Sequence, residues 1–159
     1  MGLQHSVKVG LSFGLTSGVI TTLGLMVGLY AGTQSETAVV AGMLTIAIAD
    51  SMSDALGIHI AEESEGIHTH LEIWVSTFTT FLTKFIIAAS FLVPVFLFSL
   101  QTAVRVCIIY GIILLIAYSF YLAKKQKRNP VFIIGEHLLI TAVVLLAGYY
   151  AGSWIKNYF

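Results

Sequence analysis

Residues 9–30 read VGLSFGLTSGVITTLGLMVGLY and contain no charged side chain. A helix needs about 20 mostly apolar residues to cross the hydrocarbon of a bilayer, so this stretch predicts a membrane-spanning helix. The composition agrees, because 57% of the 159 residues are hydrophobic and only 10% are charged. A water-soluble domain has about a quarter of its residues charged. The composition therefore excludes soluble enzymes and soluble nucleic-acid-binding domains.

Beyond residues 9–30, four further apolar runs are long enough to span a bilayer. The connections between them are short, which predicts a single domain, residues 1–159. The predicted fold class is an all-α integral membrane protein with five transmembrane helices in a lipid bilayer. The net charge is zero, with 8 basic and 8 acidic residues, so no nucleic-acid partner is expected. The four further spans are residues 37–61, 73–98, 103–123 and 131–155.

Charge predicts the orientation of the bundle. Lys and Arg collect in cytoplasmic loops, and the one dense basic cluster is Lys124, Lys125, Lys127 and Arg128. Counting spans from that cluster places the N-terminus and the acidic connection 62–72 in the cytosol. The C-terminus is expected on the opposite side of the membrane. The sequence does not indicate which membrane this is.

Glycines recur every four residues in the first predicted span. Small residues at this spacing let helix backbones approach closely, and close packing drives helix association in lipid. The pattern predicts a packing strip, used within the chain or across a dimer, and we expect a homodimer through this glycine-rich first helix. The strip contains Gly10, Gly14, Gly18, Gly24, Gly28 and Gly32.

Two acids interrupt the second span. Asp50 and Asp54 lie four residues apart, about 6 Å along one helical face. A charge in hydrocarbon costs at least about 2.5 kcal/mol, so the pair should face a polar cavity, bind a cation or share a proton. The alternative is a structural pair that hydrogen-bonds to Ser or Thr of a neighbouring helix. Lys84, a cation inside the third span, should pair with an acid, for which Asp50 and Asp54 are candidates, or extend to the membrane surface.

Other donors could complete a metal site near these acids. If the first two spans form a hairpin joined near Thr33, Ser17 should lie level with Asp50 and Phe13 with Asp54. Glu62 falls on the side of the acids, and the other donors of that helix fall nearly opposite. Mixed oxygen, nitrogen and sulfur donors suit Fe, Mn, Co or Zn. The predicted metal ligands are Asp50, Asp54, Ser17, Thr21, Met52, His59, Glu62 and Glu63, with Glu65 and Glu136 as additional candidates.

Several segments resemble one family. Residues 13–32, FGLTSGVITTLGLMVGLYAG, resemble the first helix of the vacuolar iron transporter family. The usual sequence of that helix is close to DGLVT, followed by an apolar run with regularly spaced glycines. Residues 41–65 resemble its second helix, with SDALGI at 53–58 where the family has Ser-Met-Ala-Leu-Gly-Glu. Residues 90–98, SFLVPVFLF, resemble the proline-containing end of its third helix, and residues 135–152 its last helix.

The resemblance implies a homodimer of five-helix subunits that moves Fe²⁺ or Mn²⁺ out of the cytosol in exchange for protons. The family's ion path runs between the first two helices. This chain differs there, because Ser17 stands where the family has Asp, Asp54 where it has Met and Ile58 where it has Glu. It also lacks the long cytosolic metal-binding insertion of some members. Asp50 and Asp54 would replace the lost acid and make a site richer in oxygen.

The predicted function is transport of a divalent metal cation, such as Fe²⁺ or Mn²⁺, driven by ion gradients. The chain has no nucleotide-binding loop and no cofactor motif, so neither enzymatic activity nor a tightly bound cofactor is expected. One alternative is a metal-dependent membrane enzyme built on Asp50, Asp54 and His59, with Glu136 and His137 approaching from the last span. The other is a structural membrane subunit that transports nothing.

Overall fold

The computed structural model describes residues 2–158, which are almost entirely helical, and five of its helices are long and apolar enough to cross a membrane. Each predicted span matches one of them, with Phe98 at the end of the third span just beyond its helix, so the predicted fold class is confirmed. The second and third spans are each built from consecutive helical pieces. The elements are α1 (Leu3–Thr33), α2 (Glu36–Thr45), the π-helical turn η1 (Ile46–Asp50), α3 (Ser51–Glu65), α4 (His70–Ser90), α5 (Leu92–Leu97), α6 (Leu100–Lys125) and α7 (Pro130–Tyr158).

Local signals in the sequence set the helix ends. α1 stops at Gln34, which adopts a left-handed conformation with φ of 50°, and Ser35 then caps α2 by accepting a hydrogen bond from the Ala38 amide. α3 stops at Gly66, with φ of 66°, where the absence of a Cβ removes the steric penalty. Thr69 and Glu72 form a reciprocal capping box at the start of α4. These caps keep the connections between spans short.

The third span is broken near its end, between α4 and α5. Pro94 has no amide hydrogen and cannot bond to the carbonyl of Ser90 four residues earlier. The chain turns at Phe91, and α5 then runs from Leu92 to Leu97. The predicted uninterrupted span at residues 73–98 is therefore a long helix followed by a short one.

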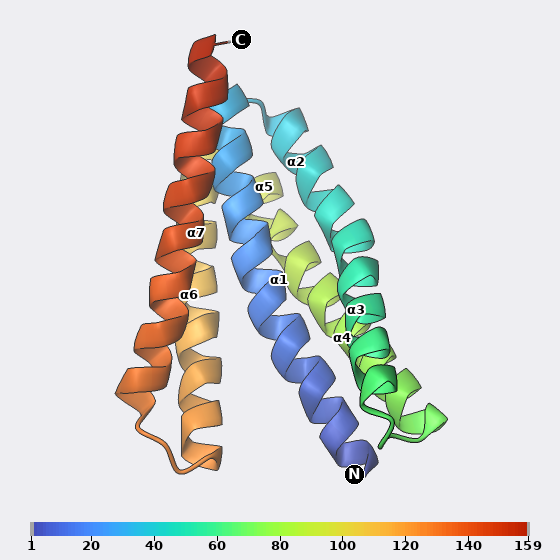
Figure 1. Cartoon of the computed structure of the whole chain (residues 1–159). Coiled ribbons are helices and arrows are strands. Elements are labelled where there is room, and N and C mark those ends of the chain that lie inside the picture. Colours follow the sequence, from blue (N-terminus) through green and yellow to red (C-terminus); the bar gives the residue numbers. More distant parts are fainter. Residues whose placement is uncertain (1, 159) are drawn as a thin grey trace.

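Helix α1 passes through the middle of the bundle and packs most extensively on α4 and α7. Figure 1 shows α2, α3 and α4 beside one side of α1 and α6 and α7 beside the other. The N-terminus, the α3–α4 connection and the α6–α7 connection lie at one end of the molecule, and the C-terminus lies at the other (Figure 1). This is the relative arrangement that five successive spans require.

The glycine strip of α1 is divided between two partners in the same chain. Its first half meets α4, where a Cβ at Gly14 would lie 2.8 Å from the carbonyl oxygen of Thr80. Its second half meets glycines of α7, where a Cβ at Gly28 would lie 3.2 Å from the carbonyl oxygen of Gly148. The predicted role in packing is confirmed. Both halves of the strip thus contact helices of the same chain, and the expected homodimer stays a prediction.

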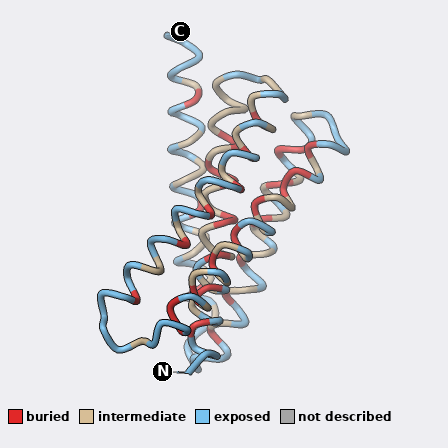
Figure 2. Tube along the Cα trace, turned by 90° about the vertical axis from the view of Figure 1, so that its right-hand side faces the viewer, coloured by how far each residue is buried: buried red, intermediate tan, exposed pale blue. Residues whose placement is uncertain are grey.

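Apolar and polar side chains are buried at different places along the bundle. The apolar core lies where α1, α2, α5 and α6 meet and includes Leu23, Met43, Phe91 and Cys107. Most of the buried polar side chains belong instead to α1, α3 and α4, and two others, Ser119 and Thr141, belong to α6 and α7. Figure 2 shows the buried residues along the inner sides of the helices and exposed residues along the outer sides. The fold therefore places the buried polar side chains of α1, α3 and α4, which we call the polar seam, beside an apolar core.

Candidate functional site

A cluster of charged side chains lies where α1, α3 and α4 meet. Lys84, from α4, has a side chain with no exposed surface, and its ammonium nitrogen lies 2.5 Å from Oδ2 of Asp50. The same nitrogen forms an ion pair with Asp54, one helical turn further along. Ser17 of α1 donates a hydrogen bond of 2.7 Å to Oδ2 of Asp54 and accepts one of 3.0 Å from Lys84. We call these four residues the Lys84 cluster.

The two carboxylates are less enclosed than the lysine. The side chain of Asp50 retains 32% of its exposure and that of Asp54 retains 21%. The cluster is therefore enclosed around Lys84 and partly exposed at the two acids. With two acids and one base, the cluster carries one negative charge when all three groups are ionised.

The backbone explains why Ser17 contacts Asp54, although the sequence predicted that it would lie level with Asp50. The connection between the first two spans falls at Gln34 and Ser35, one residue beyond the predicted position. The π-helical turn η1, which ends at Asp50, then widens the helix. Both features move the register of the second span toward Asp54. The sequence carries no clear signal for the π-helical turn.

Several other predicted ligands lie elsewhere. Thr21 donates a hydrogen bond of 2.9 Å to the backbone carbonyl of Ser17, so its hydroxyl supports α1. Glu65 bonds to His68 at the end of α3, at 3.1 Å. Glu63 is exposed there, and Glu136 is exposed on α7. These four residues do not join the Lys84 cluster.

Glu62 occupies a separate buried position on the polar seam. Its side chain accepts a hydrogen bond of 2.5 Å from Ser76 of α4, and the residue is 6% exposed. Glu62 lies on the α4 side of its helix, as Asp54 does, and its contact with Ser76 was not predicted. A signal for that partner was present, since Ser76, Thr80 and Lys84 recur every four residues and therefore share one face of a helix. All three are fully buried against neighbouring helices.

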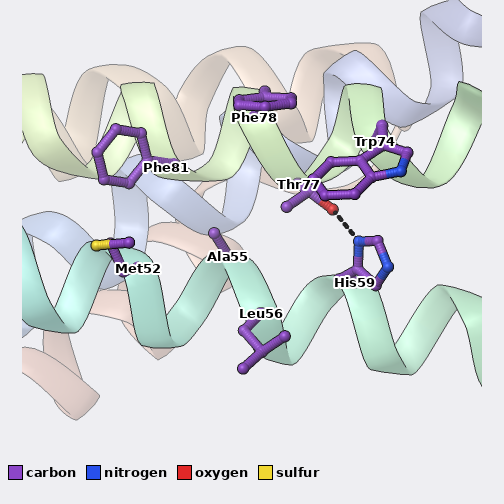
Figure 3. A pocket seen from close by; sticks show the side chains of 8 residues that line it. All are labelled: Met52, Ala55, Leu56, His59, Trp74, Thr77, Phe78 and Phe81. Carbon is purple, nitrogen blue, oxygen red and sulfur yellow. Dashed lines mark hydrogen bonds between the residues drawn. The ribbon is translucent and has the colours of Figure 1, made fainter.

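Met52 and His59 line a different cavity, of about 310 Å³, between α3 and α4. Figure 3 shows Met52 at one end of it and His59 at the other, with aromatic side chains of α4 across from them. The Nδ1 atom of His59 lies 3.0 Å from the hydroxyl of Thr77. The two donors are seven residues apart, about 10 Å along the helix axis, so they cannot hold one ion. The lining is Met52, Ala55, Leu56, His59, Trp74, Thr77, Phe78 and Phe81.

The structure therefore divides the predicted set of metal ligands among several places. Among residues 2–158, no three His, Cys, Asp or Glu side chains converge as a metal-binding group. His137, suggested as a partner for an enzyme site, instead contacts Ser119, with 2.7 Å between its Nδ1 and the hydroxyl oxygen. The two acids, the serine and the lysine are the residues that the fold does bring together. They are a compact charged group on three membrane-length helices.

Comparisons with protein-family models, with curated proteins and with solved structures gave no match to this chain.

Proposed function

We propose that the protein is a multi-pass membrane transporter that exchanges a divalent metal cation, Fe²⁺ or Mn²⁺, for protons at the Lys84 cluster. The observation that supports this most directly is the position of the Lys84 ammonium, which sits against both Asp50 and Asp54. A cation substrate would need the same two carboxylates. Lys84 is then a built-in competitor that holds the site when no metal is bound.

Charge balance gives the exchange its stoichiometry. Any net charge in a region of low dielectric constant is costly, so the stable forms of the cluster should be neutral. Without metal, neutrality requires a protonated Lys84, one protonated aspartic acid and one aspartate. With a divalent ion, it requires two aspartates and an uncharged lysine. Passing from the first form to the second releases two protons, one from the aspartic acid and one from the ammonium.

The ligand chemistry fits hard or borderline divalent ions. Two carboxylates and the hydroxyl of Ser17 supply oxygen, which suits Mn²⁺ and is accepted by Fe²⁺. Both acids are partly exposed, so water could complete the coordination. Met52, the nearest thioether in sequence, is 59% exposed and lines the other cavity, so it adds no soft ligand. We therefore expect little preference for soft ions.

The direction of transport rests on the resemblance to vacuolar iron transporters and on the basic cluster at residues 124–128. Both favour a cytosolic N-terminus and export from the cytosol. Protons would then enter the cytosol as metal leaves it. A proton gradient directed into the cytosol would drive the export.

Flux through the purified protein in sealed proteoliposomes tests the proposal. A metal-sensitive dye and a pH dye inside the vesicles should report one metal ion moved for two protons. Clamping the membrane potential with potassium and valinomycin should leave the rate unchanged, because the exchange moves no net charge. Failure to carry Fe²⁺, Mn²⁺, Co²⁺ and Zn²⁺ would overturn the proposal and favour the structural subunit. Metal entry driven by membrane potential without proton release would overturn the exchange mechanism.

A further inference from the structure

A second cavity, of about 510 Å³, lies between the N-terminal part of α1 and the C-terminal part of α6. It is at the end of the molecule that carries the basic α6–α7 connection, where these two helix segments stand apart (Figure 1). The Lys84 cluster does not contribute to it. A space of this size at the end of a membrane bundle must be filled by solvent or lipid, so its lining indicates its occupant.

The lining combines positive charge with tyrosine. Every side chain in it that can be charged at neutral pH is basic, and none of the described lining residues is Asp or Glu. The ammonium nitrogen of Lys125 donates a hydrogen bond of 3.2 Å to the hydroxyl of Tyr121 and lies 5.4 Å from the centre of its ring. The hydroxyl of Tyr118 donates a hydrogen bond of 2.5 Å to Ser12, which joins the two helices. The polar lining is His5, Lys8, Ser12, Tyr118, Tyr121, Lys125 and Gln126.

Apolar side chains complete the cavity. Val9, Leu11 and Leu122 line it beside the basic residues. Cations next to hydrocarbon-like surface match a ligand with an anionic head and an apolar chain. Tyrosine also suits the boundary between headgroups and hydrocarbon, because its ring is apolar and its hydroxyl is polar. A free phosphate ion would leave the apolar part of this lining unused.

We propose that this cavity binds an anionic phospholipid of the leaflet that faces the basic α6–α7 connection. Lys8 and Lys125 would contact the phosphate group, and Val9, Leu11 and Leu122 would contact the start of an acyl chain. Basic pockets between membrane helices on the cytoplasmic side are suited to such headgroups. The lipid would join α1 to α6 where these helices stand apart. This inference is independent of metal transport.

Native mass spectrometry of the full chain in detergent tests the inference, with equal amounts of dioleoylphosphatidylglycerol and dioleoylphosphatidylcholine added. The wild-type protein should retain phosphatidylglycerol in preference to phosphatidylcholine. The variant K8Q/K125Q should bind phosphatidylglycerol about 25-fold more weakly, because each lysine near an anionic lipid contributes about a fivefold factor. Its melting temperature in phosphatidylcholine alone should equal that of the wild type, since both lysines lie at the surface.

The matched control is K124Q/K127Q, which removes the same charge from neighbouring positions that do not line the cavity. It should retain most of the preference for phosphatidylglycerol. Equal losses in both variants would show that general surface charge attracts the lipid and would overturn the proposed site. No preference for phosphatidylglycerol in the wild type would overturn it as well. Soluble glycerophosphoglycerol should not compete, and if it did so at similar concentration, the apolar part of the site would be refuted.

Discussion

The ammonium nitrogen of Lys84 lies 2.5 Å from Oδ2 of Asp50, which joins the third span to the second through a buried ion pair. Removing one partner of such a pair leaves an uncompensated charge, which in soluble proteins costs about 3–5 kcal/mol. Because Lys84 also pairs with Asp54, either acid alone can still balance its charge. The cluster can therefore lose one carboxylate and remain paired, which makes single variants informative about function.

The first prediction concerns those two acids. Asp50→Asn and Asp54→Asn keep the shape of the side chain and remove its negative charge. Each variant should fold, since Lys84 keeps one carboxylate partner, yet lose metal flux at least about tenfold, equivalent to about 1.4 kcal/mol. Flux into proteoliposomes and melting temperature measure the two effects. The double variant, which leaves Lys84 with no acid of the cluster, should be clearly less stable.

Glu63→Gln is the matched control, because Glu63 is an exposed acid on the same helix as Asp54. It should transport metal at the wild-type rate. If both single aspartate variants also did so, the Lys84 cluster would be a structural feature, and the transport site would lie elsewhere.

A second prediction concerns the contact of α1 with α4. A Cβ at Gly14 would lie 2.8 Å from the carbonyl oxygen of Thr80 and 2.9 Å from the Cβ of Thr83. Backbone cannot move aside easily, so Gly14→Ala should lower the free energy of unfolding by about 1–3 kcal/mol. Gly57→Ala is the control, since a Cβ there has no neighbour within 4 Å. Its melting temperature in detergent should be unchanged or slightly higher, because alanine favours helix more than glycine does.

Much of the fold could be predicted because apolar runs long enough to cross a membrane generally form helices. The five spans follow from length and hydropathy, and the break at Phe91 is consistent with Pro94, which the sequence displays. The pairing of Lys84 with the acids was also predictable, because a cation deep in an apolar run needs a partner. These inferences depend on composition and on covalent structure, which one sequence records fully.

The arrangement of the site was only partly predictable, because a helical wheel shows faces but not the helices that cover them. Met52 and His59 share a face of the second span, yet the fold directs them into an aromatic cavity on α4. The glycines of α1 predicted close packing, but the choice between α4, α7 and a second copy depends on tertiary structure. Ser17 contacts Asp54 because of the position of the first connection and because of the π-helical turn. The first two differences arise from contacts between segments far apart in sequence, and the third arises from local backbone geometry.

A third prediction tests the orientation in the membrane. Gln126 and Asn157 are exposed at opposite ends of the molecule, and the single natural cysteine, Cys107, is fully buried. A cysteine introduced at position 126 should react with an impermeant thiol reagent only from the cytosolic side, and one at position 157 only from the other side. The wild-type protein should not react. Reversed labelling would invert the direction of transport that we propose.

The last prediction separates an exchanging lysine from a structural one. Arginine keeps the positive charge of Lys84 and pairs well with carboxylates, but it does not release its proton in proteins. With arginine at position 84, the metal-loaded cluster would carry a net positive charge, so Lys84→Arg should lose metal flux although the ion pairs persist. Glutamine is neutral and can still donate hydrogen bonds to the acids. Lys84→Gln should therefore transport metal better than Lys84→Arg, even if it is the less stable variant.

A purely structural lysine predicts the opposite order, because arginine would then be the better replacement for a buried cation. Comparing flux with melting temperature for Lys84→Gln, Lys84→Met and Lys84→Arg therefore distinguishes the two roles within one series. Two neutral variants are included so that the comparison with arginine still holds if one of them does not fold. Higher flux in Lys84→Arg than in both neutral variants would contradict proton release from Lys84. The neutral forms of the cluster, and the stoichiometry of two protons for each metal ion, would then have to be abandoned.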